Sequence, residues 1–232
     1  MKKLLLVLNI LFICVSGVFA QKTFISVSTL ATDVVAVASE QEPTERRTDG
    51  CNTNTPGWGV SLGTVSFVTD QTWRVGSHTW SDVVQASNCG KTSFDGGLIN
   101  NFNADCRSNP NNKGDFFSWC ALTRFGNELC PEPWRVPTLD DFIALDRALG
   151  GSGSRRTNVR HRNRYLTNWG GTYGGRALSD GALLNQGTWG IYWSQSENNA
   201  GSGFRLNFAT DGYVGPRGWD NKNRGFSLRC VR

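Results

Sequence analysis

Alternating apolar and polar positions predict short β-strands in two parts of the chain. Between residues 63 and 82, alternating runs lie on both sides of Gly76-Ser77. A two-residue loop that contains glycine between two such runs is typical of a β-hairpin. Toward the C-terminal end, three more runs have a strand-like pattern, at 190–195, 204–208 and 226–231. The pattern therefore predicts short antiparallel sheets.

One segment has the spacing of an amphipathic helix. Residues 138–149 place apolar side chains three or four positions apart, so that one stripe faces the core. Thr138 can cap the first turn together with Asp141, as in a capping box, and a pair of glycines follows the last turn. We interpret the glycine- and arginine-rich stretch 150–164 that follows as a loop.

The first twenty residues have the pattern of a secretory signal peptide. Two lysines precede an apolar run from Leu4 to Val15, and small residues lead up to Ala20. This run is too short to span a bilayer, and no later stretch is apolar enough to do so. Residues 21–50 resemble an exposed leader and linker, so we expect one domain over 51–232 in an exported protein without a membrane span.

The cysteines agree with export to an oxidising compartment. Six of them follow the signal peptide: Cys51, Cys89, Cys106, Cys120, Cys130 and Cys230. An even number in an exported chain favours three disulfides, for which fifteen pairings are possible. The sequence has no Cys-x-x-Cys pair and only two histidines, which favours disulfides over a metal site.

Composition and charge exclude several classes of protein. The chain has 27 glycines and many asparagines, which disfavour long helices, and 9 tryptophans and 13 phenylalanines, which argue against disorder. The formal net charge of +5 falls to +3 without the two lysines of the signal peptide. We therefore expect neither a helical bundle nor a nucleic-acid partner.

Three blocks of sequence resemble a known family. They are CPEPWRVPTLDDF at 130–142, YWSQSE at 192–197 and GFSLRCVR at 225–232. With FSWCAL at 117–122, they resemble the Fibrobacter succinogenes major paralogous domain, which is common in exported proteins of Bacteroidetes-type bacteria and related to the Lcl-type C-terminal domain of collagen-like adhesins. The resemblance implies a loop-rich α+β fold of C-type-lectin-like type, distantly shared with formylglycine-generating enzymes. We expect short antiparallel sheets, one or two helices and three disulfides.

The same resemblance implies a disulfide pairing and roles for signature residues. The first and last strands of that scaffold lie together, which implies a disulfide between the cysteines near them. The expected pairs are Cys130–Cys230, Cys89–Cys106 and Cys51–Cys120. Trp134 and Phe142 are expected as core anchors, and Arg135 as a buried or bridging charge.

A carbohydrate site is the first functional hypothesis. Sugars present apolar faces and many hydroxyl groups, so their sites commonly combine aromatic rings with Asn, Asp and Arg. We expect Trp189 and Trp193 in the core. Three aromatic residues in stretches rich in glycine and asparagine are candidates for ligand contact: Trp169, Tyr173 and Trp219. The polar residues that follow Trp219, Asp220 and Asn221, are candidates as well.

A basic segment is the second candidate for ligand contact. Arg160, Arg162 and Arg164 lie in a ten-residue stretch without an acidic residue. Guanidinium groups bind carboxylate and sulfate through paired hydrogen bonds, which favours an acidic polysaccharide or another cell-surface protein as partner. The alternative is a solvated loop whose arginines pair with scattered acids.

Calcium binding receives little support from the sequence. Calcium-dependent lectins use a Trp-Asn-Asp strand and a Glu-Pro-Asn loop, because Ca²⁺ prefers several oxygen ligands at one point. Here Trp219-Asp220-Asn221 permutes the first motif, and Glu132-Pro133 is followed by tryptophan. We expect no cofactor.

Catalysis receives no more support. A Ser-His-Asp site would have to use His78 or His161, and the chain has no Gly-x-Ser-x-Gly elbow. We therefore expect a non-enzymatic binding or adhesion module at the cell surface or outside the cell, with the periplasm as an alternative. The other functions considered are a structural subunit of a pilus, fibre or envelope complex and an enzyme with an unrecognised site.

Overall fold

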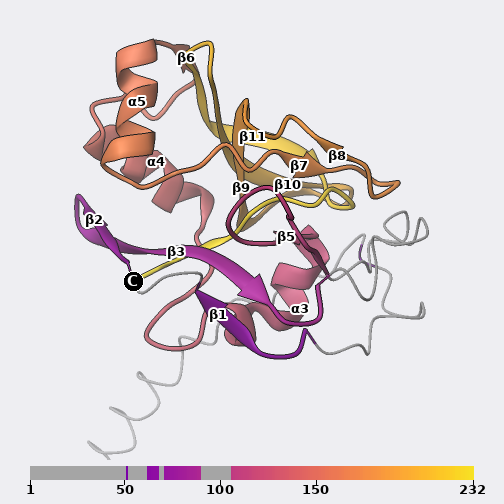
Figure 1. Cartoon of the computed structure of the whole chain (residues 1–232). Coiled ribbons are helices and arrows are strands. Elements are labelled where there is room, and N and C mark those ends of the chain that lie inside the picture. Colours follow the sequence, from indigo (N-terminus) through magenta and orange to yellow (C-terminus); the bar gives the residue numbers. More distant parts are fainter. Residues whose placement is uncertain (1–50, 52–61, 68–70, 90–105) are drawn as a thin grey trace, which may run out of the picture. The chain divides into compact units, whose positions relative to one another are not determined.

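A computed structural model of the chain describes residues 51, 62–67, 71–89 and 106–232 (Figure 1). All of these belong to one unit, Arg47–Arg232. The expected signal peptide and leader lie outside the described residues.

The first sheet is built around its longest strand. It contains β1 (Val65–Phe67), β2 (Trp73–Val75), β3 (His78–Ala86) and β12 (Arg229–Val231). All three other strands pair antiparallel with β3, so the first and last strands of the described chain share one partner. The hairpin predicted at Gly76-Ser77 is confirmed, and Gly76 has φ 62°, in the left-handed region that favours glycine.

The second sheet has the order β6–β11–β10–β9. Its strands are β6 (Arg156–Thr157), β9 (Trp189–Asn199), β10 (Ser202–Ala209) and β11 (Tyr213–Asn221). β9 and β10 confirm the strands predicted at 190–195 and 204–208, whereas β11 was not predicted. Two small ribbons complete the strands: β4 (Cys106–Arg107) with β5 (Phe116–Phe117), and β7 (Arg176–Ala177) with β8 (Leu183–Leu184).

Three helices occur among the described residues, one more than the upper number expected. They are α3 (Trp119–Leu129), α4 (Leu139–Ala148) and α5 (Val159–Thr167). The capping box predicted for α4 is present, because the Thr138 side chain accepts from Asp141 N and the Asp141 side chain accepts from Thr138 N. The interpretation of 150–164 as a loop is wrong in its second half, because Asn158 caps α5 there.

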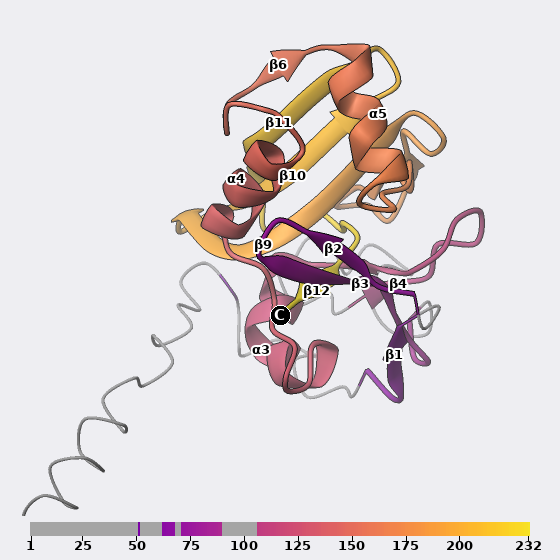
Figure 2. The ribbon, with the colours of Figure 1, turned by 90° about the vertical axis from the view of Figure 1, so that its left-hand side faces the viewer.

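Helices α4 and α5 cover one face of the second sheet (Figures 1 and 2). Between them lies an apolar cluster that includes Phe142 of α4, Tyr165 of α5 and Phe208 of β10. A second cluster surrounds α3 and contains Trp193, which is buried as expected, whereas Trp189 is only partly buried. The part of this sheet that α4 and α5 cover is therefore closed by packing.

A buried arginine connects the first sheet to the segment that follows α5. Arg229 of β12 lies between the rings of Trp73 and Trp169, with its guanidinium carbon 4.3 and 4.4 Å from the two ring centroids. It donates to the backbone oxygens of Ser81 and Trp169. Burial lowers the pKa of Arg229 to about 10, which still leaves it charged at neutral pH.

The three disulfides have the expected pairing. They are Cys51–Cys120, Cys89–Cys106 and Cys130–Cys230. The α+β class and the short antiparallel sheets are also confirmed, while the relation to C-type lectins stays a prediction. Among the signature residues, Phe142 is buried and Trp134 is partly buried against Phe67.

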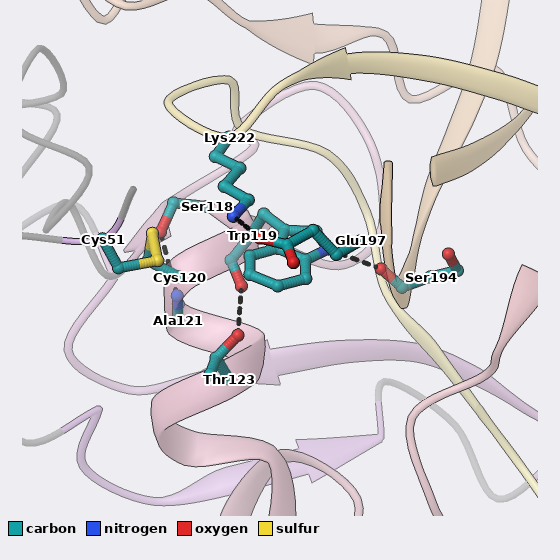
Figure 3. The surroundings of a disulfide bond; sticks show 9 residues. All are labelled: Cys51, Ser118, Trp119, Cys120, Ala121, Thr123, Ser194, Glu197 and Lys222. Atoms are coloured by element: carbon teal, nitrogen blue, oxygen red, sulfur yellow. Dashed lines mark hydrogen bonds and ion pairs between the residues drawn. A yellow bond between two sulfur atoms is a disulfide. The ribbon is translucent and has the colours of Figure 1, made fainter. Parts of the chain in front are cut away.

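Figure 3 shows how the start of α3 is held beside the first disulfide. Trp119 donates its indole N–H to the backbone oxygen of Ser194 at 3.0 Å. The buried Lys222 ammonium lies 4.2 Å from the centroid of the Trp119 ring and pairs with Glu197. The absence of a side chain at Gly203 makes room for this indole, since a Cβ there would lie 2.3 Å from Trp119 Cδ1.

The helices of the described chain are too short or too polar to cross a bilayer.

Candidate functional site

The residues predicted to contact a ligand do not form one site. Trp169 is fully buried and packs against Trp80, Tyr192 and the Arg229 guanidinium. A side chain in this position has no surface for a sugar, so the prediction for Trp169 is wrong. Tyr173 is partly buried, and its ring packs against Phe208.

The arginines of the basic segment do not form one ligand surface, in contrast to the prediction from the sequence. Helical periodicity places Arg160 and Arg164 on one side of α5 and Arg162 on another. Arg162 donates to the Tyr173 hydroxyl, and Arg164 Nη1 donates to the backbone oxygen of Leu149 at 2.7 Å. Two of the three arginines therefore brace α5 against its surroundings, and Arg160 stays exposed.

The strand β11 separates the remaining three predicted residues. Trp219 is opposite Phe204 in the register, while Asp220 is opposite Gly203. Since side chains alternate between the two faces of a sheet, Trp219 and Asn221 lie on the α4–α5 side and Asp220 lies on the other. Trp219 is 58% exposed. We refer below to the side of the second sheet that points away from α4 and α5 as the far face.

Three arginines surround Asp220 on the far face, and we name these four residues the arginine cluster. Arg205 Nε lies 3.3 Å from Asp220 Oδ2, Arg176 Nη1 lies 3.8 Å from the same oxygen, and Arg224 Nε lies 4.0 Å from Oδ1. They come from β10, from β7 and from the turn after β11. Three positive charges thus face one negative charge.

The arginine cluster has more hydrogen-bond donors than acceptors. Within the described part of the chain, the buried Nε atoms of Arg176, Arg205 and Arg224 have no hydrogen-bond partner of good geometry, and neither does Arg205 Nη1. Burial lowers the pKa of Arg205, and the charge of Arg176 lowers it further, against the opposing charge of Asp220. An arginine remains protonated at neutral pH in such surroundings, so the excess of positive charge is retained.

Next to the arginine cluster, two glycines leave the far face of β11 without side chains. Gly218 is opposite Arg205, and Gly215 is opposite Asn207. A Cβ at Gly218 would lie 2.9 Å from both Arg205 Nη1 and Asn207 Oδ1. Asn207 is only 2% exposed, and its Oδ1 has no hydrogen-bond partner among the residues that the structure describes.

An aromatic pair continues this surface. The ring centroids of Trp189 and Tyr213 are 5.5 Å apart, and both residues are partly buried. Arg155 lies over the Tyr213 ring, with its guanidinium carbon 5.2 Å from the centroid. A Cβ at Gly215 would lie 2.8 Å from both the Tyr213 hydroxyl and Asn207 Oδ1. Charged, amide and aromatic groups therefore follow one another along β10 and β11.

Comparison with known proteins assigns the chain to a family. A family model described as Fibrobacter succinogenes major domain matches residues 76–232. The chain belongs to this family. The match confirms the resemblance in the signature blocks. No curated protein and no solved structure matches the chain.

The matched segment of this Fibrobacter succinogenes major domain includes β3 to β12 and every residue of the arginine cluster. Of the signature residues of the family, Arg135 has the bridging role that was expected. It donates Nη1 and Nη2 to the two oxygens of Asp141 at 2.5 and 2.8 Å. Burial works to raise the pKa of Asp141, but the hydrogen bonds from Arg135 and Thr138 outweigh it and hold this pKa below its usual value.

Both histidines of the family domain contact aspartates. His78 Nε2 lies 3.3 Å from Asp141 Oδ1, and its Nδ1 lies 3.4 Å from Ser77 Oγ. The Asp141 carboxylate already binds a guanidinium and caps α4, so it serves the fold at this point. The contact between His78 and Asp141 was not predicted from the sequence, because it joins the β2–β3 turn to a helix some sixty residues later.

The second histidine belongs to a buried cluster between α4 and α5. His161 Nε2 and the Tyr165 hydroxyl each lie 2.7 Å from Asp146 Oδ1, and Gly153 N donates to Oδ2 at 2.7 Å. Burial raises the pKa of Tyr165 well above its usual value, and the charge of Asp146 adds to this. Tyr165 therefore stays protonated and donates to the carboxylate.

No group of three or more His, Cys, Asp and Glu side chains arranged for a metal ion is found within the described ranges.

Proposed function

We propose that this domain is a non-enzymatic binding module that recognises a glycan or another surface polymer through the far face of its second sheet. The supporting observation is that the partly exposed Arg176 and Arg224 and the partly buried Tyr213 lie on this face. Aromatic rings stack on the apolar faces of sugars, and guanidinium groups bind carboxylates and sulfates.

Export to the cell surface or beyond belongs to the same proposal. Three disulfides close the domain, and disulfides persist mainly in oxidising compartments. A rigid, cross-linked scaffold that carries polar and aromatic groups on one sheet face fits a role in adhesion.

A glycan array tests this proposal. Purified oxidised protein is screened with and without EDTA and at two salt concentrations. We expect binding that survives EDTA, and Tyr213→Ala is expected to remove it while the near-ultraviolet circular dichroism of the fold is retained. Trp219→Ala is the matched control, since it removes an exposed aromatic ring from the opposite side of the same strand.

The outcomes separate the competing functions. Binding that is lost in Trp219→Ala and kept in Tyr213→Ala would place the site on the α4–α5 side. Loss with EDTA would show a metal-dependent site. No binding to any glycan, together with copurification of partner proteins, would favour the structural subunit of a pilus, fibre or envelope complex.

A further inference from the structure

We infer that the arginine cluster binds the anionic group of an acidic saccharide, and that Asp220 is an internal counter-ion which competes with the ligand. The inference rests on the proposed function and adds the chemical class of the ligand. It uses arginines that the sequence did not single out.

The first argument is the balance of charge. Among the described residues, Asp220 is the acidic partner that Arg176, Arg205 and Arg224 share, at 3.3 to 4.0 Å. Charge-assisted hydrogen bonds between nitrogen and oxygen are commonly about 2.7–2.9 Å long. Asp220 therefore lies close to all three guanidinium groups at distances longer than those of strong charge-assisted hydrogen bonds.

The second argument is access. The side chains of Arg176 and Arg224 are 30% and 25% exposed, whereas that of Arg205 is 16% exposed. The cluster is thus open to a ligand on one side and removed from water on the other. Partial burial of this kind strengthens the attraction between a guanidinium and an anion, because water screens it less.

The third argument is what lies beside the charges. Arg205 Nη1 and Asn207 Oδ1 approach the same point above Gly218, and Asn207 Oδ1 and the Tyr213 hydroxyl approach the same point above Gly215. A saccharide with a carboxylate or sulfate can place its anionic group on Arg176 and Arg224, the more exposed arginines, and its ring near the partly buried Tyr213. A simple inorganic anion uses only the first of these contacts.

The basic helix α5 is a weaker place for such a ligand. Arg162 and Arg164 already donate to groups of this chain, while Arg160 is a single exposed charge. Arg160→Ala therefore serves as a matched control, because it removes one exposed arginine without changing the far face.

Isothermal titration calorimetry on the full oxidised domain tests the inference. The probes are oligogalacturonate, which is carboxylated, sulfated dextran and neutral dextran. We expect Arg176→Ala and Arg224→Ala each to weaken oligogalacturonate binding about tenfold or more, and Arg160→Ala to leave it within about twofold. Arg176 and Arg224 are chosen because their side chains are more exposed than that of Arg205. Thermal unfolding of each variant verifies that it is folded.

Asp220→Asn gives the result that a general basic surface would not give. Removal of the competing carboxylate is expected to tighten oligogalacturonate binding several-fold. Asp140→Asn is its control, since it makes the same change of charge on the exposed side of α4. A gain of similar size in Asp140→Asn, or no gain in Asp220→Asn, overturns the role of Asp220 as counter-ion.

The probes distinguish the failure of this inference from the failure of the proposed function. Preference for either acidic probe over neutral dextran supports an anionic ligand, and the stronger of the two identifies carboxylate or sulfate. Equal binding of neutral dextran, unchanged by Arg176→Ala but lost in Tyr213→Ala, overturns the anionic ligand and leaves the binding module standing. Absence of binding to these probes and to every glycan of the array overturns both.

Discussion

The buried carboxylate of Asp146 offers a direct test of how the domain is held together. Asp146 is fully buried in α4 and contacts His161 and Tyr165 of α5 and the backbone N–H of Gly153. These contacts fasten α5 and the preceding loop onto α4. Replacement by alanine removes all of them at once.

The expected loss follows from the groups that remain behind. Asp146→Ala leaves a backbone N–H, a tyrosine hydroxyl and an imidazole nitrogen buried without their partner. A buried polar group without a partner costs about 1–3 kcal/mol. Because the three contacts share one carboxylate and are not independent, we expect the free energy of unfolding to fall by about 3–6 kcal/mol.

Urea denaturation of the oxidised protein, followed by tryptophan fluorescence, measures this loss. Asp140→Ala is the control, since this exposed residue on the same helix is expected to cost about 0.3–1 kcal/mol through the helix dipole. Tyr165→Phe removes one hydrogen bond and is expected to cost about 1 kcal/mol. The reasoning is refuted if Asp146→Ala is no more destabilising than Asp140→Ala.

Three further predictions concern stability. Because the pKa of Asp141 is lower in the folded protein than in the unfolded chain, its contribution to stability is present above about pH 4 and is lost as the pH falls. The variant Asp141→Asn should therefore flatten the pH dependence of the unfolding free energy between pH 6 and 2.5. Joint replacement of Cys130 and Cys230 by alanine should lower the unfolding free energy by about 4–5 kcal/mol, since the disulfide joins residues 100 positions apart. An unchanged urea midpoint would contradict this prediction. Gly203→Ala should cost about 1–3 kcal/mol because its Cβ meets a buried indole, whereas Gly201→Ala, with its nearest atom at 3.7 Å, should stay within about 0.5 kcal/mol. Equal urea midpoints for the two glycine variants would show that the indole can move aside.

Elements with local signals were predictable from the sequence. The capping box that begins α4 is made by Thr138 and Asp141, three residues apart, and the β2–β3 turn needs only the positive φ of Gly76. Such signals act over a few residues and do not depend on the rest of the fold. The disulfide pairing was not predicted from a local signal. Its prediction came from the family resemblance and not from the spacing of the cysteines.

Elements whose pattern is atypical were missed. In α5, only His161 and Tyr165 are buried, and the histidine is polar, so the segment shows no apolar stripe. Their spacing of four residues and the possible cap at Asn158 were the available signals. In β11, glycines and Pro216 resemble a loop, yet the bulge in the β10–β11 register between Arg205 and Asn207 accommodates the proline.

The arginine cluster could not be predicted for a different reason. Arg160, Arg162 and Arg164 were grouped because they are neighbours in sequence, but a helix points such neighbours in different directions. Arg176, Arg205 and Asp220 are far apart in sequence and meet through the pairing of β10 with β11 and the bridge between Ala177 and Gly225. A shift of one residue in that pairing would turn every side chain of the shifted strand to the other face. The positive surface therefore exists only in the correctly paired sheet, so the loss of β10–β11 pairing and the loss of the proposed binding surface are one event.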